Sequence, residues 1–180
     1  AIERGRIATP PPLARIVVAV DPPATGGARS AACGIVAAGI DADGIGYVVA
    51  DATVAKATPE AWASRAADLY HALGADRLVA EANQGGDMVA SVLRQADPTV
   101  PVARVTATRG KWTRAEPVAL LYAQGRVRHA GTFPELEDEM CGLGPDGRAD
   151  GASPDRVDAL VWALTELMLG GAAPPRGRRV

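Results

Sequence analysis

The sequence has few of the residues that form disulfides or bind soft metals. Among 180 residues it has two cysteines, Cys33 and Cys141, and two histidines, His71 and His129. Two cysteines so far apart are too few for a disulfide framework or a zinc site, so we expect both to be reduced, packed thiols of a cytosolic protein. The histidines have no evident partners in the pattern and give no sign of a Ser/His/Asp arrangement. We expect surface or packing positions for both.

Long apolar runs and nucleotide-binding motifs are also missing. No run approaches the roughly 20 apolar residues of a membrane span, and the N-terminus lacks a signal-peptide core, so we expect no membrane partner. The Gly-Lys-Ser/Thr sequence of a P-loop does not occur, which argues against an ATPase built from this chain alone. The 19 Lys and Arg residues nearly balance the 21 Asp and Glu residues, and a net charge of -2 neither favours nor excludes nucleic acid.

The composition is that of a globular protein. Apolar residues make up 48% of the chain and charged residues 22%, and the length suffices for one sizeable core. We expect one domain over residues 15–170. Residues 1–14 contain three consecutive prolines and are predicted to be a linker from a missing upstream domain, as a fragment or a processed product would have. Residues 171–180 are basic and predicted to be disordered.

Segments of strand and helix character alternate along the chain. Apolar runs predict strands at 15–21, 31–40 and 46–53, joined as an antiparallel meander with a hairpin turn at Asp41-Ala-Asp-Gly44. Further strands are expected at 77–81 and 100–105, and helices at 59–73, 85–96, 111–124, 134–143 and 154–169. Pro117 lies inside the third of these helices, or else marks the start of its regular part. This order predicts an α/β fold, a ribonuclease H-like mixed sheet with helices on both faces.

Acidic residues end two of the predicted strands. Asp21 and Glu81 each follow a run of apolar residues, at the rim where α/β sheets bind ligands. Taken singly, each would be an ordinary cap or turn residue, since a carboxylate is too costly to bury unpaired. Two more acids, Asp155 and Asp158, begin an apolar helix. Together the four predict a metal site, because clustered carboxylates need a cation to offset their repulsion.

Asp155 and Asp158 are three residues apart and therefore share one face at the positive end of their helix. Helix capping alone would account for Asp155. It does not account for Asp158, which lies one turn further on in a mostly apolar stretch. We therefore predict Asp158 as a direct metal ligand and Asp155 as a second ligand or an outer partner.

The four carboxylates define the expected metal and reaction. Their oxygens are hard ligands that suit Mg²⁺ or Mn²⁺, and no Cys/His cluster competes for a softer metal. Ligands from two strand ends and a helix can hold two ions about 3.5–4 Å apart, one activating water and the other stabilising the leaving oxygen. We therefore predict in-line hydrolysis of phosphodiester bonds, with Asp21, Glu81 and Asp158 as the catalytic residues.

Basic residues are concentrated between positions 104 and 128, although the whole chain is slightly acidic. Such a group is often no more than a solvated surface, but contacts to phosphate need one. Lys111 is the foremost member, because a helix N-terminus and a lysine both favour a phosphate oxygen. The candidate DNA contacts are Arg109, Lys111, Arg114, Arg126 and Arg128, with Arg104 nearby.

Asn83-Gln-Gly-Gly86 follows Glu81 almost directly, between a predicted strand and a predicted helix. Its two glycines fit a tight turn and a close approach of the backbone to a substrate equally well.

Seven short segments are distinctive as a set. They are Val20-Asp-Pro-Pro23, Cys33-Gly-Ile-Val36, Glu81-Ala-Asn-Gln-Gly-Gly-Asp-Met-Val89, Arg109-Gly-Lys111 with Arg114-Ala-Glu-Pro-Val118, Gly125-Arg-Val-Arg-His129, Leu136-Glu-Asp138 and Ser153-Pro-Asp-Arg-Val-Asp-Ala159. Together they resemble the C-terminal nuclease domain of phage terminase large subunits, from about residue 15 to residue 169. The resemblance is greatest to the prophage and gene-transfer-agent branch of that family.

The resemblance implies a metal-dependent endonuclease that cuts concatemeric double-stranded DNA at the start and end of packaging, in the cytoplasm of a bacterial host cell. It implies an N-terminal ATPase domain in the same full-length protein, with residues 1–14 as the connection. It also implies a portal and a small terminase subunit as partners. The family's acidic ligands fall on Asp21, Glu81 and Asp158, and Lys111 matches a basic position of the family.

Two other functions are open from the sequence. A structure-selective DNA resolvase of the same fold would prefer branched DNA to linear duplex. A non-catalytic docking module for the portal or the small terminase subunit would bind its partner without metal, and its acids would be structural.

Overall fold

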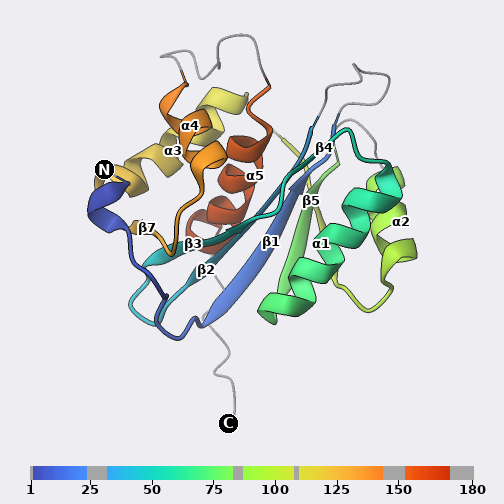
Figure 1. The fold of residues 1–180 in the computed structure, drawn as a ribbon, viewed down its shortest axis with the longest axis horizontal. Helices are drawn as coiled ribbons and strands as arrows, with labels where there is room; N and C mark the ends of the chain where they lie inside the picture. The colour runs from blue at the N-terminus through green and yellow to red at the C-terminus, as the bar shows by residue number, and fades with distance from the viewer. Residues whose placement is uncertain (1, 24–31, 83–86, 108–109, 144–152, 171–180) are drawn as a thin grey trace.

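A mixed sheet with helices on both faces forms the body of the chain (Figure 1). The computed structural model describes residues 2–23, 32–82, 87–107, 110–143 and 153–170. Within these residues the strands are β1 (Arg15–Asp21), β2 (Ala32–Ile40), β3 (Gly46–Asp51), β4 (Val54–Ala55), β5 (Arg77–Glu81), β6 (Val102–Val105) and β7 (Val127–His129). The helices are α1 (Pro59–Leu73), α2 (Asp87–Ala96), α3 (Lys111–Ala123), α4 (Pro134–Cys141) and α5 (Asp155–Leu164), with a short 3-10 helix η1 (Glu3–Gly5) and a π-helix η2 (Thr165–Leu169).

The sheet has the strand order β6-β5-β1-β2-β3-β7, and the short β4 pairs with β2. β1, β2 and β3 are antiparallel neighbours, which confirms the predicted meander. β5 lies parallel to β1, β6 parallel to β5, and β7 parallel to β3, so the sheet is mixed. The predicted strand at 46–53 is shorter than expected, because β3 ends at Asp51 and the chain then forms β4.

The turn between β2 and β3 is organised by Asp41. One oxygen of its carboxylate accepts hydrogen bonds from the backbone N–H groups of Asp43 and Ile45, both at 2.9 Å. The other oxygen accepts a bond from the hydroxyl of Tyr47 at 2.9 Å. Gly44 takes the left-handed conformation, with φ of 81°, which a glycine adopts without strain. The predicted hairpin is thereby confirmed.

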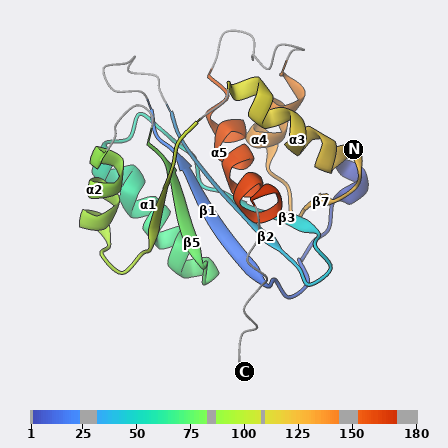
Figure 2. The same ribbon diagram turned by 180° about the vertical axis from the view of Figure 1, so that it is seen from behind.

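Successive residues of β1 face opposite sides of the sheet and belong to two separate cores. Val18 and Val20 pack in the core beneath α1 and α2, together with Trp62. Val17 and Ala19 pack in the core beneath α3, α4 and α5. Figure 2 shows the two helical layers on either side of the sheet. Because side chains alternate along a strand, Asp21 at the end of β1 lies on the α5 side.

The ends of α1 and α3 agree with the predicted ones to within one residue, and Gly125, just beyond α3, has a left-handed φ of 70°. Thr58 caps α1 through a hydrogen bond from Ala61 N–H to its hydroxyl oxygen at 3.2 Å, and Gly74 ends the helix in a left-handed conformation. In α3, Pro117 lies within a helix that begins at Lys111, although a proline cannot donate the intrahelical bond. α5 ends at Leu164, and the chain continues as the π-helix η2. Together α5 and η2 cover the predicted helix.

The N-terminal segment packs against the edge of the sheet formed by β7. Ile7 forms an isolated bridge with Ala130, and η1 precedes it. The predicted tail at 171–180 lies outside the described residues. Of the helices in the described ranges, none has the length and apolarity required to cross a bilayer.

Candidate metal centre

Three of the four predicted acids meet at one end of the sheet. Asp21 at the end of β1 and Asp155 and Asp158 in the first turn of α5 each offer a carboxylate oxygen, and these oxygens all lie within 4.8 Å of one another. Asp21 is buried, with 6% of its surface exposed, and the two α5 acids are half-buried. Three carboxylates this close repel one another strongly unless a cation or a proton offsets their charge.

The close approach of α5 to the sheet depends on Gly34. Gly34 is the partner of Asp21 in the pairing of β1 with β2. A Cβ atom at this position would lie 2.1 Å from the backbone oxygen of Asp155, far inside van der Waals contact. Glycine at position 34 therefore lets the first turn of α5 lie against β2, beside Asp21.

Glu81 lies next to this group but not in it. Val20 of β1 pairs with Ala80 of β5, and Asp21 and Glu81 are the next residues of these parallel strands. The Glu81 carboxylate accepts a hydrogen bond from the indole N–H of Trp162 in α5, at 3.3 Å. The structure thus brings Glu81 to the same end and the same face of the sheet, and α5 holds its side chain.

The first turn of α5 receives an unexpected cap from α4. The Oε2 atom of Glu139 accepts hydrogen bonds from the backbone N–H groups of Arg156 and Val157, at 3.1 and 3.2 Å. The Arg156 guanidinium donates to Glu139 at 3.2 Å and to Asp51 of β3 at 3.0 Å. Sequence reasoning missed these residues, because nothing local links positions 51, 139 and 156.

The charges at this end of the sheet alter the titration of nearby groups. Burial, together with the negative charges of Asp21 and Asp155, raises the pKa of the Cys33 thiol well above its usual range. Burial also raises the pKa of Glu139, against the opposing effect of its hydrogen bonds from Val157 and Arg156. Cys33 therefore stays a neutral, packed thiol as predicted. Cys141 is exposed, so the prediction of a packed thiol is wrong there, since α4 presents it at the surface.

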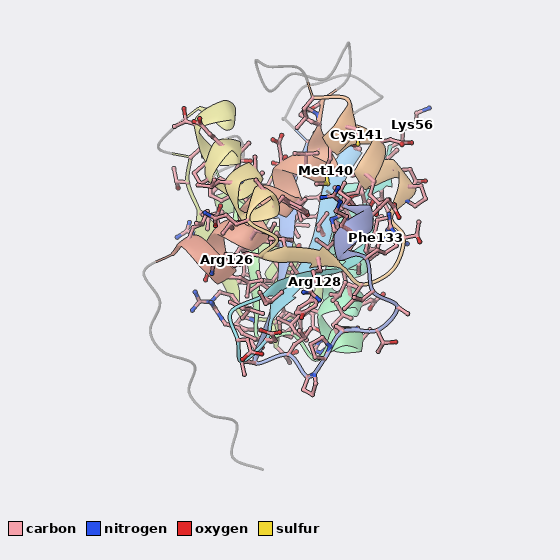
Figure 3. The ribbon with its side chains drawn as sticks, turned by 90° about the vertical axis from the view of Figure 1, so that its left-hand side faces the viewer. Lys56, Arg126, Arg128, Phe133, Met140 and Cys141 are labelled. Carbon is pink, nitrogen blue, oxygen red and sulfur yellow. The ribbon has the colours of Figure 1, made fainter. Side chains whose placement is uncertain are left out.

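The predicted DNA contacts fall into separate places. Arg109 and the side chain of Lys111 lie outside the described residues, as do residues 83–86. The guanidinium of Arg114 lies over the ring of Trp162, 4.6 Å from its centroid, and so beside the acidic end of the sheet. Arg126, just before β7, and Arg128, within it, are exposed (Figure 3). The pairing of β7 with Gly46–Val48, at the start of β3, places both at the end of the sheet opposite to the acids.

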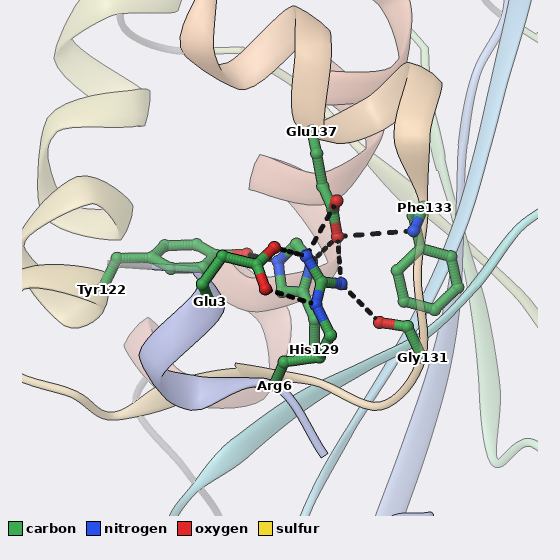
Figure 4. Close-up of polar contacts among 7 residues, drawn as sticks. All are labelled: Glu3, Arg6, Tyr122, His129, Gly131, Phe133 and Glu137. Carbon is green, nitrogen blue, oxygen red and sulfur yellow. Dashed lines mark hydrogen bonds and ion pairs between the residues drawn. The ribbon is translucent and has the colours of Figure 1, made fainter. Parts of the chain in front are cut away.

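His129 is buried, as expected for a packing position, but it has partners that the sequence did not indicate. Its Nε2 atom lies 2.8 Å from the Tyr122 hydroxyl, and its Nδ1 atom lies 2.9 Å from Glu137 Oε1. Glu137 also accepts from Arg6 at 2.7 Å, and Arg6 pairs with Glu3 (Figure 4). This network ties the N-terminal segment to α4. His71 lies at the surface, 2.7 Å from Asp97.

A mixed sheet with two helical layers and acids at the ends of its central strands defines a ribonuclease H-like domain. A family model agrees with this class. The chain belongs to the family described as the terminase RNaseH-like domain, whose model matches residues 18–167. No curated protein sequence matches the chain significantly.

Solved structures of several terminase nucleases share the fold. The large terminase nuclease from thermophilic phage G20c is 20% identical, with a TM-score of 0.64 over 84% of this chain and 82% of that one. The P22 large terminase nuclease domain is 13% identical, with a TM-score of 0.67 over 94% and 89% of the two chains. The human cytomegalovirus terminase nuclease domain is 16% identical, with a TM-score of 0.64 over 83% and 81%. The predicted ribonuclease H-like fold is confirmed.

Proposed function

We propose that the chain is a metal-dependent nuclease domain that hydrolyses phosphodiester bonds of double-stranded DNA. The observation that carries the proposal is the meeting of Asp21, Asp155 and Asp158 within 4.8 Å. Membership of the terminase RNaseH-like family supports it. Structures of the G20c large terminase nuclease with bound magnesium, cobalt and zinc support a metal at such a domain.

The donor set fits a hard divalent cation. All three groups are carboxylates, which suit Mg²⁺ or Mn²⁺. Asp21, Asp155 and Asp158 would hold the ion, with Asp21 and Asp158 as direct ligands. We propose that Glu81 joins them as a catalytic residue and as a ligand in a two-ion arrangement. A bound ion would supply a more acidic water and stabilisation of the negative charge that develops on the phosphate.

The residues of the chain hold this arrangement in place. Asp21 is fixed by a central strand whose residues Val17–Val20 are fully buried. Asp155 accepts a hydrogen bond from the Ser153 hydroxyl at 2.8 Å, which orients its carboxylate. Trp162 orients Glu81 in the same way. Because these groups are positioned before substrate binds, little reorganisation would be needed during the reaction.

We propose that DNA lies across the acidic end of the sheet, with Arg109, Lys111 and Arg114 near its phosphates. The position of Arg114 over Trp162 supports this orientation. Arg126 and Arg128 lie at the other end of the sheet. In this proposal they would form a second, separate part of the DNA interface. Contacts to phosphate position a duplex without reading its bases, so this interface predicts little sequence preference.

The family membership and the seven segments support a role in genome packaging. We propose that the domain cuts concatemeric DNA in a bacterial host cell, and that it belongs to the prophage and gene-transfer-agent branch. In this proposal residues 1–14 lead from an ATPase domain of the full-length protein, and the portal and small terminase subunit are the partners.

Cleavage of supercoiled plasmid tests the proposal. Purified chain is incubated with plasmid and Mn²⁺, Mg²⁺ or chelator, beside an Asp158→Ala variant whose circular dichroism matches that of the parent chain. We expect nicked and linear products only with metal and only from the parent chain. Cleavage that persists in chelator or in the variant would contradict the proposal. A parallel assay on branched and linear duplexes separates a packaging nuclease from a resolvase, which would prefer the branched DNA.

A further inference from the structure

We propose that Glu139 is a positioning residue of the metal centre, acting from α4 on the first turn of α5. The inference rests on the function proposed above, because it concerns the same carboxylates. Glu139 is not placed as a ligand. Its role is to fix the backbone that carries Asp155 and Asp158.

The N-cap residue of α5 is Pro154, which offers no side-chain cap to the first turn of the helix. Glu139 supplies an acceptor from another helix, through its bonds from the Arg156 and Val157 N–H groups at 3.1 and 3.2 Å. A carboxylate at a helix N-terminus also interacts favourably with the helix dipole. Glu139 thus fixes the turn both by hydrogen bonds and by charge.

The side chain of Arg156 extends this link to the sheet. Its Nη1 atom donates to Glu139 at 3.2 Å, and its Nε atom donates to Asp51 of β3 at 3.0 Å. The Arg156 and Asp51 side chains are 24% and 7% exposed, so solvent screens this pair less than a surface pair. α4, α5 and β3 therefore meet at a residue that lies between Asp155 and Asp158 in the sequence.

The other half of α4 is held as well. Glu137, two residues before Glu139, accepts hydrogen bonds from the Arg6 guanidinium and from the Phe133 N–H, the latter at 3.3 Å. Its carboxylate also lies 2.9 Å from the His129 ring (Figure 4). These contacts attach α4 to β7 and to the N-terminal segment. Glu139 consequently projects from a helix that is itself anchored.

A ligand that depends on a supporting residue loses metal affinity when that support is removed, typically by 10–100-fold. A purely structural Glu139 would instead affect only the stability of the fold. Metal affinity of the folded chain is therefore the measurement that separates the two roles. The two hydrogen bonds that Glu139 accepts from backbone N–H groups do not involve the carboxylates of the metal ligands, so the effect on metal affinity would be transmitted by the position of the turn.

The experiment is calorimetric titration of the full chain with Mn²⁺, comparing the parent with Glu139→Gln. Gln keeps the shape of the side chain but removes the charge. The matched control is Glu135→Gln, an exposed acid in the first turn of the same helix. We expect about a tenfold weaker Mn²⁺ affinity for Glu139→Gln, with no change for Glu135→Gln. If Glu139→Gln does not fold, Asp51→Asn replaces it, because this change loosens Arg156 from β3. We expect Asp51→Asn to weaken the Mn²⁺ affinity as well.

The outcomes separate the two proposals. Equal Mn²⁺ affinity in the parent and in folded Glu139→Gln would overturn the positioning role and leave the nuclease proposal intact. Where Glu139→Gln does not fold, equal affinity in the parent and in folded Asp51→Asn would do the same. A parent chain that binds no Mn²⁺ would overturn the metal centre itself, and the positioning role with it. A loss of Mn²⁺ affinity in Glu139→Gln but not in Glu135→Gln, with thermal unfolding showing both variants folded at the titration temperature, would support the inference.

Discussion

Gly34 and Asp155 are in such close contact that a Cβ atom at position 34 would lie 2.1 Å from the Asp155 backbone oxygen. They belong to β2 and to the first turn of α5, which are far apart in the sequence. Gly34 is also the strand partner of Asp21. The contact therefore sets the distance between the carboxylate at the end of β1 and those at the start of α5.

Gly34→Ala is predicted to push the first turn of α5 away from β2. The new methyl group would meet backbone atoms, which cannot rotate aside, so we expect unfolding free energy to fall by about 1–3 kcal/mol. Mn²⁺ affinity and plasmid cutting should fall with it. Denaturant unfolding and calorimetry measure the two effects. In Gly46→Ala, the control, the methyl would meet the flexible Met168 side chain at 2.7 Å, and metal binding should survive. Equal metal affinity in both variants would refute the spacing role.

Trp162→Phe removes the donor that holds Glu81 and keeps an aromatic ring beside Arg114. Because an outer hydrogen bond to a ligand typically affects activity by 10–100-fold, we expect cutting to slow by roughly tenfold. The free energy of unfolding should fall by about 1–2 kcal/mol. Trp62→Phe is the matched control, since Trp62 is buried in the core on the other face of the sheet. Trp62→Phe should lower the free energy of unfolding without lowering the rate at which folded protein cuts DNA. An equal loss of cutting rate in both variants would mean that the hydrogen bond from Trp162 to Glu81 has no particular role.

Arg114→Gln and Arg128→Gln test how DNA lies on the domain. Both are measured in an Asp158→Asn background, so that binding is observed without cutting. If phosphates contact the acidic end of the sheet, Arg114→Gln should weaken binding and reduce the salt dependence by about one ion. Arg128→Gln, at the other end, should have the smaller effect. A larger effect of Arg128→Gln in fluorescence anisotropy titrations over several salt concentrations would reverse the proposed orientation.

The link between the N-terminal segment and α4 predicts a pH dependence of stability. The hydrogen bond from Arg6 is the main cause that lowers the pKa of Glu137 from 4.5 to about 2, and His129 contributes to the same shift. A lowered carboxylate pKa stabilises the fold above pH 4.5, and this contribution is lost as the pH falls toward 2. Arg6→Ala should therefore unfold at a lower temperature than the parent at neutral pH, with the difference shrinking between pH 4.5 and 2.

Differential scanning calorimetry across this pH range measures the effect. The control is Arg4→Ala, which removes an exposed arginine of the same 3-10 helix. Its melting temperature should follow that of the parent at every pH. A difference between Arg6→Ala and the parent that stays constant down to pH 2 would show that Glu137 is not the titrating partner.

Much of the fold followed from local sequence patterns. The β-branched run that ends at Asp21 forms the central strand, and the Asp41 turn and the Thr58 cap formed as expected, because each depends on residues a few positions apart. The same patterns placed carboxylates at strand ends and at a helix start. Parallel pairing of β1 with β5 then brought Glu81 beside Asp21.

The features that the sequence did not reveal depend on contacts between distant segments. Glu139 read as one acid among several in α4, and only the packing of α4 on α5 makes it a cap. Arg128 follows α3 in the chain, but the parallel pairing of β7 with the start of β3 places it away from the acids. Strand register and helix packing decide these positions, and neither is encoded within a short window of sequence.

Calorimetric titration with Mn²⁺ of the parent chain and of Asp21→Asn tests the central claim most directly. Asn keeps the size of the buried side chain and removes its charge, and circular dichroism establishes that both proteins are folded. We predict saturable Mn²⁺ binding by the parent and a loss of at least about tenfold in affinity for Asp21→Asn. Equal Mn²⁺ binding by the two folded proteins would contradict a metal centre built on Asp21, Asp155 and Asp158.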